Sequence, residues 1–168
     1  MRKLGNLKKA VIEIAQILAQ DETICKLLVN DSNDPLNEAT PSMTLNDLID
    51  QKYICIFPPV ENRIEDYGRN TFLSILLEDI TFSNEDKVNS ASIIIYASTN
   101  EDHILLVNNK NRLLEIVDKI AELLDNKKIS VAGKLNLRTA VHTMLSEFHS
   151  AYRIRFTLSD QSTERVEI

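Results

Sequence analysis

The sequence predicts an α+β fold in which two principal helices pack on a mainly antiparallel sheet. Two segments, 3–19 and 109–125, carry apolar residues at alternating three- and four-residue spacings, which is the period of an amphipathic helix. The segments 71–82, 90–98 and 151–159 are rich in β-branched and aromatic residues and therefore predict strands. A short polar turn separates the first two of these strands, so we expect them to run antiparallel.

Capping residues predict where several helices begin and end. Asp21 is a good N-cap for a short second helix around Leu27. Thr44 followed by Asp47 resembles a capping box, which predicts a single turn of helix after it. Asn126 is suited to the C-terminal end of the second principal helix.

The strands differ in how they are expected to be buried. A short apolar strand over 53–57 is ended by Pro58 and Pro59. The run 93–95 is continuously apolar, which is typical of a central strand covered on both faces. In the closing strand, apolar residues alternate with Arg153 and Arg155, so one face is expected in the core and the other outside it.

The segment 129–149 fits two structures. Leu135, Asn136 and Leu137 alternate as in a strand. Four later apolar residues instead fit helical spacing: Val141, Met144, Leu145 and Phe148. The choice between helix and strand stays open here.

Length and composition are those of a globular protein. A chain of 168 residues with 43% hydrophobic and 26% charged residues predicts one domain, 1–168, with a flexible C-terminal tail at 160–168. The polar stretches 30–42 and 60–70 predict loops. The apolar runs are too short to span a bilayer and the N-terminus lacks the pattern of a signal peptide, so we expect no membrane association and a cytosolic protein.

The net charge of −6 argues against a nucleic-acid-binding surface, because such surfaces carry clustered Lys and Arg. DNA could still pass close to an acidic wall that does not hold it. Cys25 and Cys55 lie in apolar surroundings and are expected to be buried thiols.

No recognised catalytic motif is present. The three glycines are far apart and form no phosphate-binding loop. His142 and His149 would share one face of a helix, but two histidines alone fall short of a competent metal site. We therefore expect no catalytic residues, no metal and no cofactor.

Arg153 and Arg155 are the best candidates for a binding role. They project from the same face of a strand whose other face is apolar. One interpretation is a solvated outer face; the other is a subunit interface where the guanidinium groups meet carboxylates of a neighbouring subunit.

The order of elements resembles that of the tail-terminator or tail-completion (neck) proteins of tailed bacteriophages. The residues that carry this resemblance are 24–28 (Ile-Cys-Lys-Leu-Leu), 34–36 (Asp-Pro-Leu), 54–58 (Ile-Cys-Ile-Phe-Pro) and 152–156 (Tyr-Arg-Ile-Arg-Phe). The resemblance spans most of the chain and contains no catalytic signature. The stretch 127–149 departs from the pattern of that family.

The resemblance implies a structural virion protein. Members of that family form rings, commonly of six subunits, which cap the tail tube and join it to the head-completion proteins. It follows that this chain would be a subunit of a homo-oligomeric ring, assembled in the host cytoplasm, with DNA passing through it without specific binding. The alternative is a small, acidic, non-catalytic adaptor or binding protein.

Overall fold

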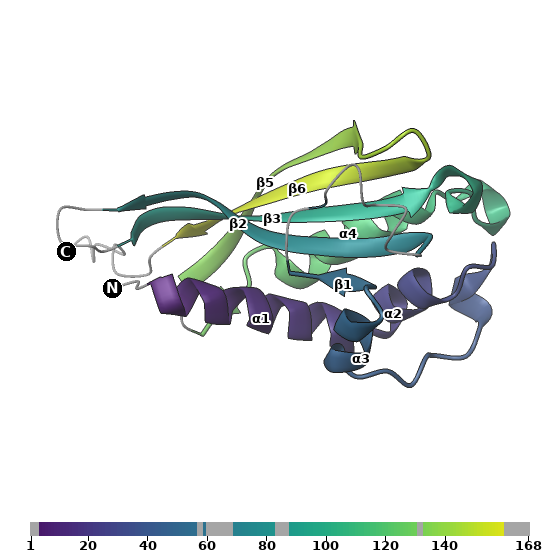
Figure 1. Cartoon of the computed structure of the whole chain (residues 1–168), viewed down its shortest axis with the longest axis horizontal. Coiled ribbons are helices and arrows are strands. Elements are labelled where there is room, and N and C mark those ends of the chain that lie inside the picture. The colour runs from purple at the N-terminus through teal and green to yellow at the C-terminus, as the bar shows by residue number, and fades with distance from the viewer. Residues whose placement is uncertain (1–3, 57–58, 60–68, 83–87, 131–132, 160–168) are drawn as a thin grey trace, which may run out of the picture.

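The computed structural model describes residues 4–56, 59, 69–82, 88–130 and 133–159. The predicted C-terminal tail and most of the predicted loop 60–70 lie outside these residues. The fold is α+β, as predicted from the sequence (Figure 1).

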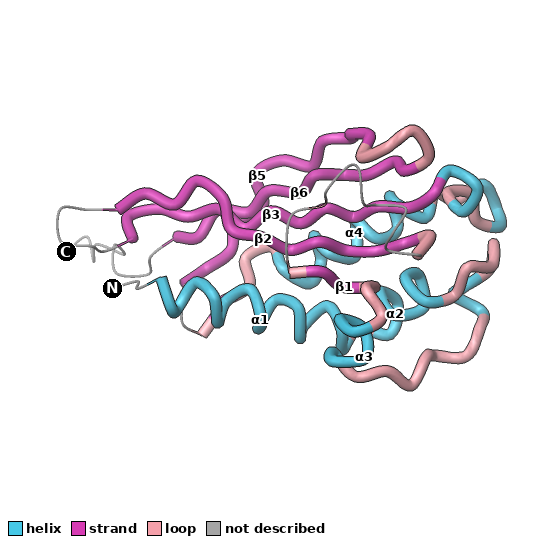
Figure 2. The backbone as a smooth tube through the Cα atoms, viewed as in Figure 1, coloured by secondary structure: helices cyan, strands magenta, loops and turns pink. Residues whose placement is uncertain are grey.

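One six-stranded sheet organises the described chain. Its order is β1-β2-β3-β6-β5-β4, and every neighbouring pair is antiparallel except β1 with β2. Figure 2 shows the strands of this sheet in magenta. The strands are β1 (Ile54–Cys55), β2 (Thr71–Phe82), β3 (Val88–Asn100), β4 (Lys128–Ile129), β5 (Gly133–Met144) and β6 (His149–Ser159).

The helices pack on one face of this sheet. They are α1 (Leu4–Gln20), α2 (Glu22–Val29), α3 (Leu45–Asp50) and α4 (Arg112–Leu124), with short 3-10 turns at Pro35–Asn37, Glu101–His103 and Val107–Asn109. A single apolar core joins the inward stripes of α1 and α4 to alternate residues of the central strands, among them Leu7, Ile14, Ile120, Ile95 and Phe156. The opposite side of the sheet is called the open face below.

The predicted N-caps of α2 and α3 are confirmed, and the predicted C-cap of α4 is displaced by one residue. The Asp21 side chain accepts a hydrogen bond from the Ile24 backbone N–H at 2.9 Å, and Thr44 forms a capping box with Asp47. The C-cap of α4 is Asp125, and Asn126 follows it with φ 62°, in the left-handed region that asparagine tolerates just after a helix.

The ambiguous segment 129–149 is extended rather than helical. It forms β4, β5 and the turn into β6. In the register, His142 lies opposite the inward-facing Tyr152, whereas His149 lies on the open face near Phe72. The two histidines are therefore on opposite sides of the sheet and share no face.

The first predicted strand is shorter than expected, and the central one is buried as expected. β1 comprises Ile54–Cys55 without Tyr53 and Ile56, because its pairing with β2 is limited to Leu73 and Ser74, and residue 57 of the predicted strand lies outside the described residues. In β3, all three of the consecutive isoleucines 93–95 are fully buried.

Arg112 is a fully buried cation at the start of α4. Its guanidinium donates hydrogen bonds to four backbone carbonyls: those of His103 (2.9 Å), Leu27 (2.6 Å), Asn30 (2.8 Å) and Ser32. Burial lowers the pKa of Arg112, and the nearby negative charges of Asp31 and Glu38 partly oppose this.

The Leu27 and Asn30 carbonyls lie at the C-terminal end of α2, where a cation is favoured by the helix dipole. Arg112 thus ties the end of α2 and the loop after it to α4.

Candidate interaction surface

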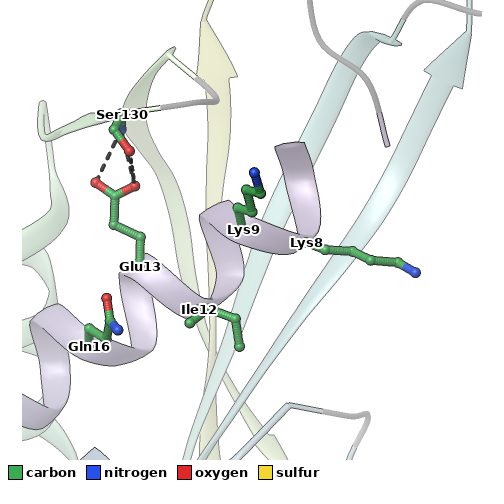
Figure 3. A pocket seen from close by; sticks show the side chains of 6 residues that line it. All are labelled: Lys8, Lys9, Ile12, Glu13, Gln16 and Ser130. Atoms are coloured by element: carbon green, nitrogen blue, oxygen red, sulfur yellow. Dashed lines mark hydrogen bonds between the residues drawn. The ribbon is translucent and has the colours of Figure 1, made fainter. Parts of the chain in front are cut away.

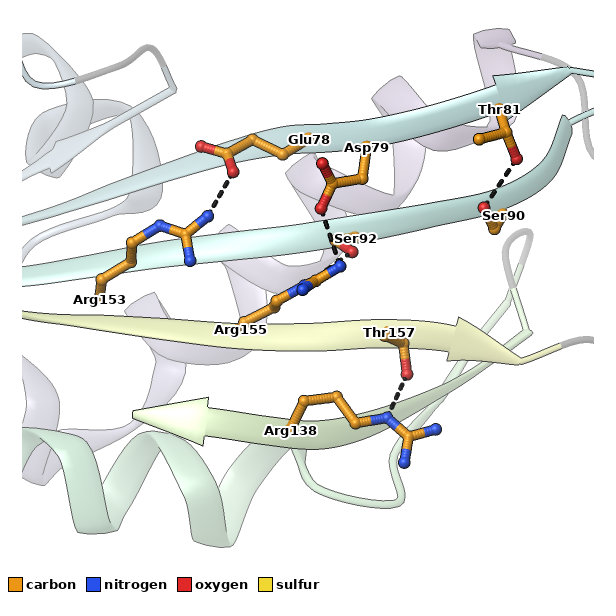
Figure 4. A network of polar contacts seen from close by, with 9 residues as sticks. All are labelled: Glu78, Asp79, Thr81, Ser90, Ser92, Arg138, Arg153, Arg155 and Thr157. Atoms are coloured by element: carbon orange, nitrogen blue, oxygen red, sulfur yellow. Dashed lines mark hydrogen bonds and ion pairs between the residues drawn. The ribbon is translucent and has the colours of Figure 1, made fainter. Parts of the chain in front are cut away.

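Arg153 and Arg155 lie on the open face of β6, as the alternation predicts, and both meet carboxylates of β2 in the same chain (Figure 4). Arg153 pairs with Glu78, and Arg155 Nη2 lies 2.8 Å from Asp79 Oδ2. Arg155 Nε also donates to Ser92 Oγ on the intervening strand β3, at 3.2 Å. The network therefore crosses three strands of one subunit.

A bulge in β2 makes this double pairing possible. Glu78 and Asp79 are consecutive, and in a regular strand they would point to opposite faces of the sheet. The register shifts between Glu78 and Thr81, and Asp79 has φ 51°. The irregularity brings both carboxylates to the side of Arg153 and Arg155, which is a recognised role of bulges.

A second bulge adds another arginine to the open face. The β5–β6 register shifts between Leu137 and Thr139, so Arg138 has no partner of its own in the ladder. Its exposed side chain reaches Thr157 of β6, with Nε 2.8 Å from Oγ1 (Figure 4). Three arginines and two carboxylates thus lie on this face, and Arg138 is the arginine whose described contact is a hydroxyl.

The ion pairs neither require nor exclude a neighbouring subunit. The arginine and carboxylate side chains are about one-third to one-half exposed, so each pair contributes on the order of 0–1 kcal/mol to folding. The pKa of Arg153 is raised: burial alone would lower it, but hydrogen bonds with Tyr96 and Glu78 outweigh that effect. The role of Arg153 and Arg155 at a subunit interface stays a prediction.

The outer edge of β5 is unpaired over residues 138–144 in the described chain. β4 pairs only with Gly133 and Lys134, and no described strand covers residues 138–144 on their outer side. Five consecutive residues, 138–142, are exposed, and so is Met144. We call residues 138–144 the β5 edge.

Large apolar side chains accompany this edge. Val141 is 56% exposed, Met144 48%, and Phe148 in the following turn 51%. Unpaired strand edges with apolar side chains are sites where other chains add. The sequence contained this signal in its ambiguous segment, but the choice of helix or strand had to be made before an edge could be recognised.

A shallow groove beside α1 is less suited to a functional role (Figure 3). The Glu13 carboxylate accepts hydrogen bonds from the Ser130 backbone N–H at 3.1 and 3.2 Å and from its hydroxyl, which fastens α1 to the end of β4. Lys8 points away from Lys9 and from Glu13 (Figure 3). No set of groups converges there on a common point.

Metal-binding and nucleophilic groups are dispersed. Among the described residues, no three His, Cys, Asp or Glu side chains are grouped so that they could hold a metal ion. His142 packs edge-on against Tyr152, with ring centroids 5.4 Å apart. Cys25 and Cys55 are free, buried thiols, as predicted, and burial raises the pKa of both.

None of the helices in the described part of the chain is long and apolar enough to cross a bilayer.

Comparison with known proteins places the chain in a family. No curated protein and no solved structure gives a significant match. The YomW family model matches residues 21–158, which include all helices after α1 and every strand except the last residue of β6. The chain therefore belongs to the YomW family, a protein family of Bacillus phage regions, and is phage-derived.

Proposed function

We propose that this protein is a structural virion component, a subunit of a homo-oligomeric ring that caps the phage tail tube and joins it to the head or neck. The observation that carries the proposal is the β5 edge, where exposed Val141 and Met144 accompany a strand edge that no described strand pairs. Such an edge is a liability in a monomer and is useful in an assembly. The phage context comes from the family.

The charge of the chain is compatible with DNA passing through the ring. With a net charge of −6, the protein has no excess of cations to neutralise phosphates and hold the nucleic acid in place. The partners expected from this role are further copies of the chain, the tail-tube protein and head-completion proteins. The dispersed histidines and cysteines give no reason to add a catalytic step.

Light scattering coupled to size-exclusion chromatography tests the proposal directly. A single species whose mass is a fixed multiple of 19.1 kDa, with closed rings in negative-stain micrographs, is the expected result. A monomer at every concentration, also in the presence of purified tail-tube protein, would overturn the ring and favour the small acidic adaptor.

A further inference from the structure

We propose that adjacent copies join by strand pairing, with the β5 edge of one subunit adding antiparallel to the outer edge of β2 in the next. This inference rests on the proposed ring and names its contact. The β2 edge is the opposite margin of the same sheet, where β1 covers only Leu73 and Ser74. From Ile75 onward, no described strand pairs with that side of β2.

The backbone of the β5 edge is directed outward at alternate residues. The Leu145 N–H donates to the His149 carbonyl at 2.9 Å, which marks 145–149 as a hydrogen-bonded pair. Hydrogen-bonded and non-hydrogen-bonded pairs alternate along an antiparallel ladder. In the register with β6, the backbone groups of Val141 and Thr143 therefore bond to β6, and those of Ala140 and His142 point to the outer edge of the sheet.

The same reasoning applies to the β2 edge. The Leu73 N–H donates outward to the Tyr53 carbonyl at 2.8 Å, so alternate residues after it, Ile75 and Leu77, also direct backbone groups away from β3. Beside them lies an apolar groove of about 440 Å³ between α1 and the sheet, lined by Lys8, Val11, Ile12, Ile56, Ile75, Leu76 and Leu77. The groove offers the apolar side chains of an added strand a place to pack.

Strand direction and charge both favour a second copy in head-to-tail contact. β2 and β6 run in one direction, and β3 and β5 in the other. Rotation about an axis along the strands keeps these directions, so β5 meets β2 of the next copy antiparallel. Arg138 on the open face of β5 would then approach the open-face carboxylates Glu78 and Asp79, of which Asp79 is 57% exposed. A heterologous contact of this kind forms a ring when its rotation closes, whereas pairing of β5 with β5 stops at a dimer.

A proline at an outward-facing position tests the contact without removing a bond to β6. Ala140→Pro removes one outward N–H and fills the edge with its ring, and proline is tolerated on edge strands in this orientation. Ala140→Val keeps the N–H and favours a strand, so it is the matched control. We expect Ala140→Pro to retain the wild-type circular dichroism spectrum and to elute as a monomer, while Ala140→Val assembles as wild type does.

Cysteine cross-linking gives a second test that does not depend on the proline variant. One batch of protein carries Val141→Cys, another carries Leu76→Cys, and a short bis-maleimide is added to each batch and to the mixture. Cross-linked dimers are expected only in the mixture, because each bond needs one β5 edge and one β2 edge. The native Cys25 and Cys55 are buried and do not compete.

The outcomes separate this inference from the ring itself. If wild type forms a ring that a folded Ala140→Pro variant forms equally well, the ring stands and the β5 contact is wrong. Cross-links in the Val141→Cys batch alone would show β5–β5 dimers and also overturn the contact. A wild type that is monomeric at every concentration removes both proposals.

Discussion

Replacement of Arg112 by methionine should lower the free energy of unfolding more than the same replacement of an exposed arginine. The guanidinium is completely buried and donates to four backbone carbonyls, which come from α2, the loop after it and the 3-10 turn at Glu101–His103. Methionine can fill much of the volume but donates no hydrogen bond. Each buried acceptor left without a partner costs about 1–3 kcal/mol, although some carbonyls will regain water near the loop. We expect a loss of about 3–5 kcal/mol, a large part of the ~5–15 kcal/mol stability of a typical domain.

Urea denaturation followed by circular dichroism measures this loss. The transition midpoint should fall while the slope m stays the same, because the native fold is weakened and not expanded. Arg112→Lys keeps the charge but loses the planar fork, so it should lie between methionine and wild type. Arg138→Met is the matched control, because that side chain is exposed and should change stability by under about 0.5 kcal/mol. A loss below about 1 kcal/mol for Arg112→Met, comparable to the control, would refute the role of Arg112 as the link between α2 and α4.

Three further predictions concern the thiols and the open face. Neither Cys25 nor Cys55 should react with a thiol reagent at pH 8 in the folded protein, because both are buried with raised pKa values; both should react in urea, and rapid labelling of native protein would contradict this. Burial raises the pKa of Cys55 from 9.0 to about 11. The folded state therefore keeps a proton that the unfolded state loses, and stability should fall as the pH rises from about 9 to 11, by at most about 3 kcal/mol. Cys55→Ala should flatten this part of the pH profile, and an unchanged profile would show that other groups cause the fall. Finally, the Arg153→Gln, Arg155→Gln double variant should melt within a few degrees of wild type. If the open face is a subunit interface, the double variant should assemble more weakly than wild type. Assembly equal to that of wild type would show that the two arginines interact only within their own chain.

Most of the fold was predictable from periodicity and capping chemistry. The stripe from Leu4 to Leu18 and the capping box at Thr44 depend on neighbours within one or two turns, so local reasoning places them well. The alternation around Arg153 and Arg155 likewise identified both the strand and its outward face. The segment 129–149 resisted assignment because Val141, Met144 and Phe148 form no alternation with polar residues. They remain exposed, so no buried face imposes a pattern on them.

The features that organise the surface arise from irregularities that a regular pattern conceals. A regular strand would separate Glu78 from Asp79, and only the bulge at Asp79 brings both carboxylates to the arginines. Arg112 adjoins Leu113 on the apolar side of α4, which was a usable signal for a buried cation. Three of its four acceptors, however, lie 80 or more residues away in the sequence, where local patterns cannot reveal them.

The intrachain ion pairs change how an interface on this sheet is to be understood. One of the two interpretations of the sequence was that Arg153 and Arg155 meet carboxylates of another subunit, but both arginines form ion pairs with Glu78 and Asp79 of the same chain. The groups on this sheet that are available to a neighbouring subunit are then the outward backbone N–H and C=O groups of the β5 edge. They can form hydrogen bonds only with water or with another strand. Charge on the open face would select the orientation of the neighbour, while strand pairing would supply most of the contact. A contact of this kind should resist high salt, whereas one that depends on Arg153 and Arg155 should weaken as salt screens the exposed charges. Assembly measured at increasing salt thus distinguishes which of the two surfaces would hold the proposed ring together.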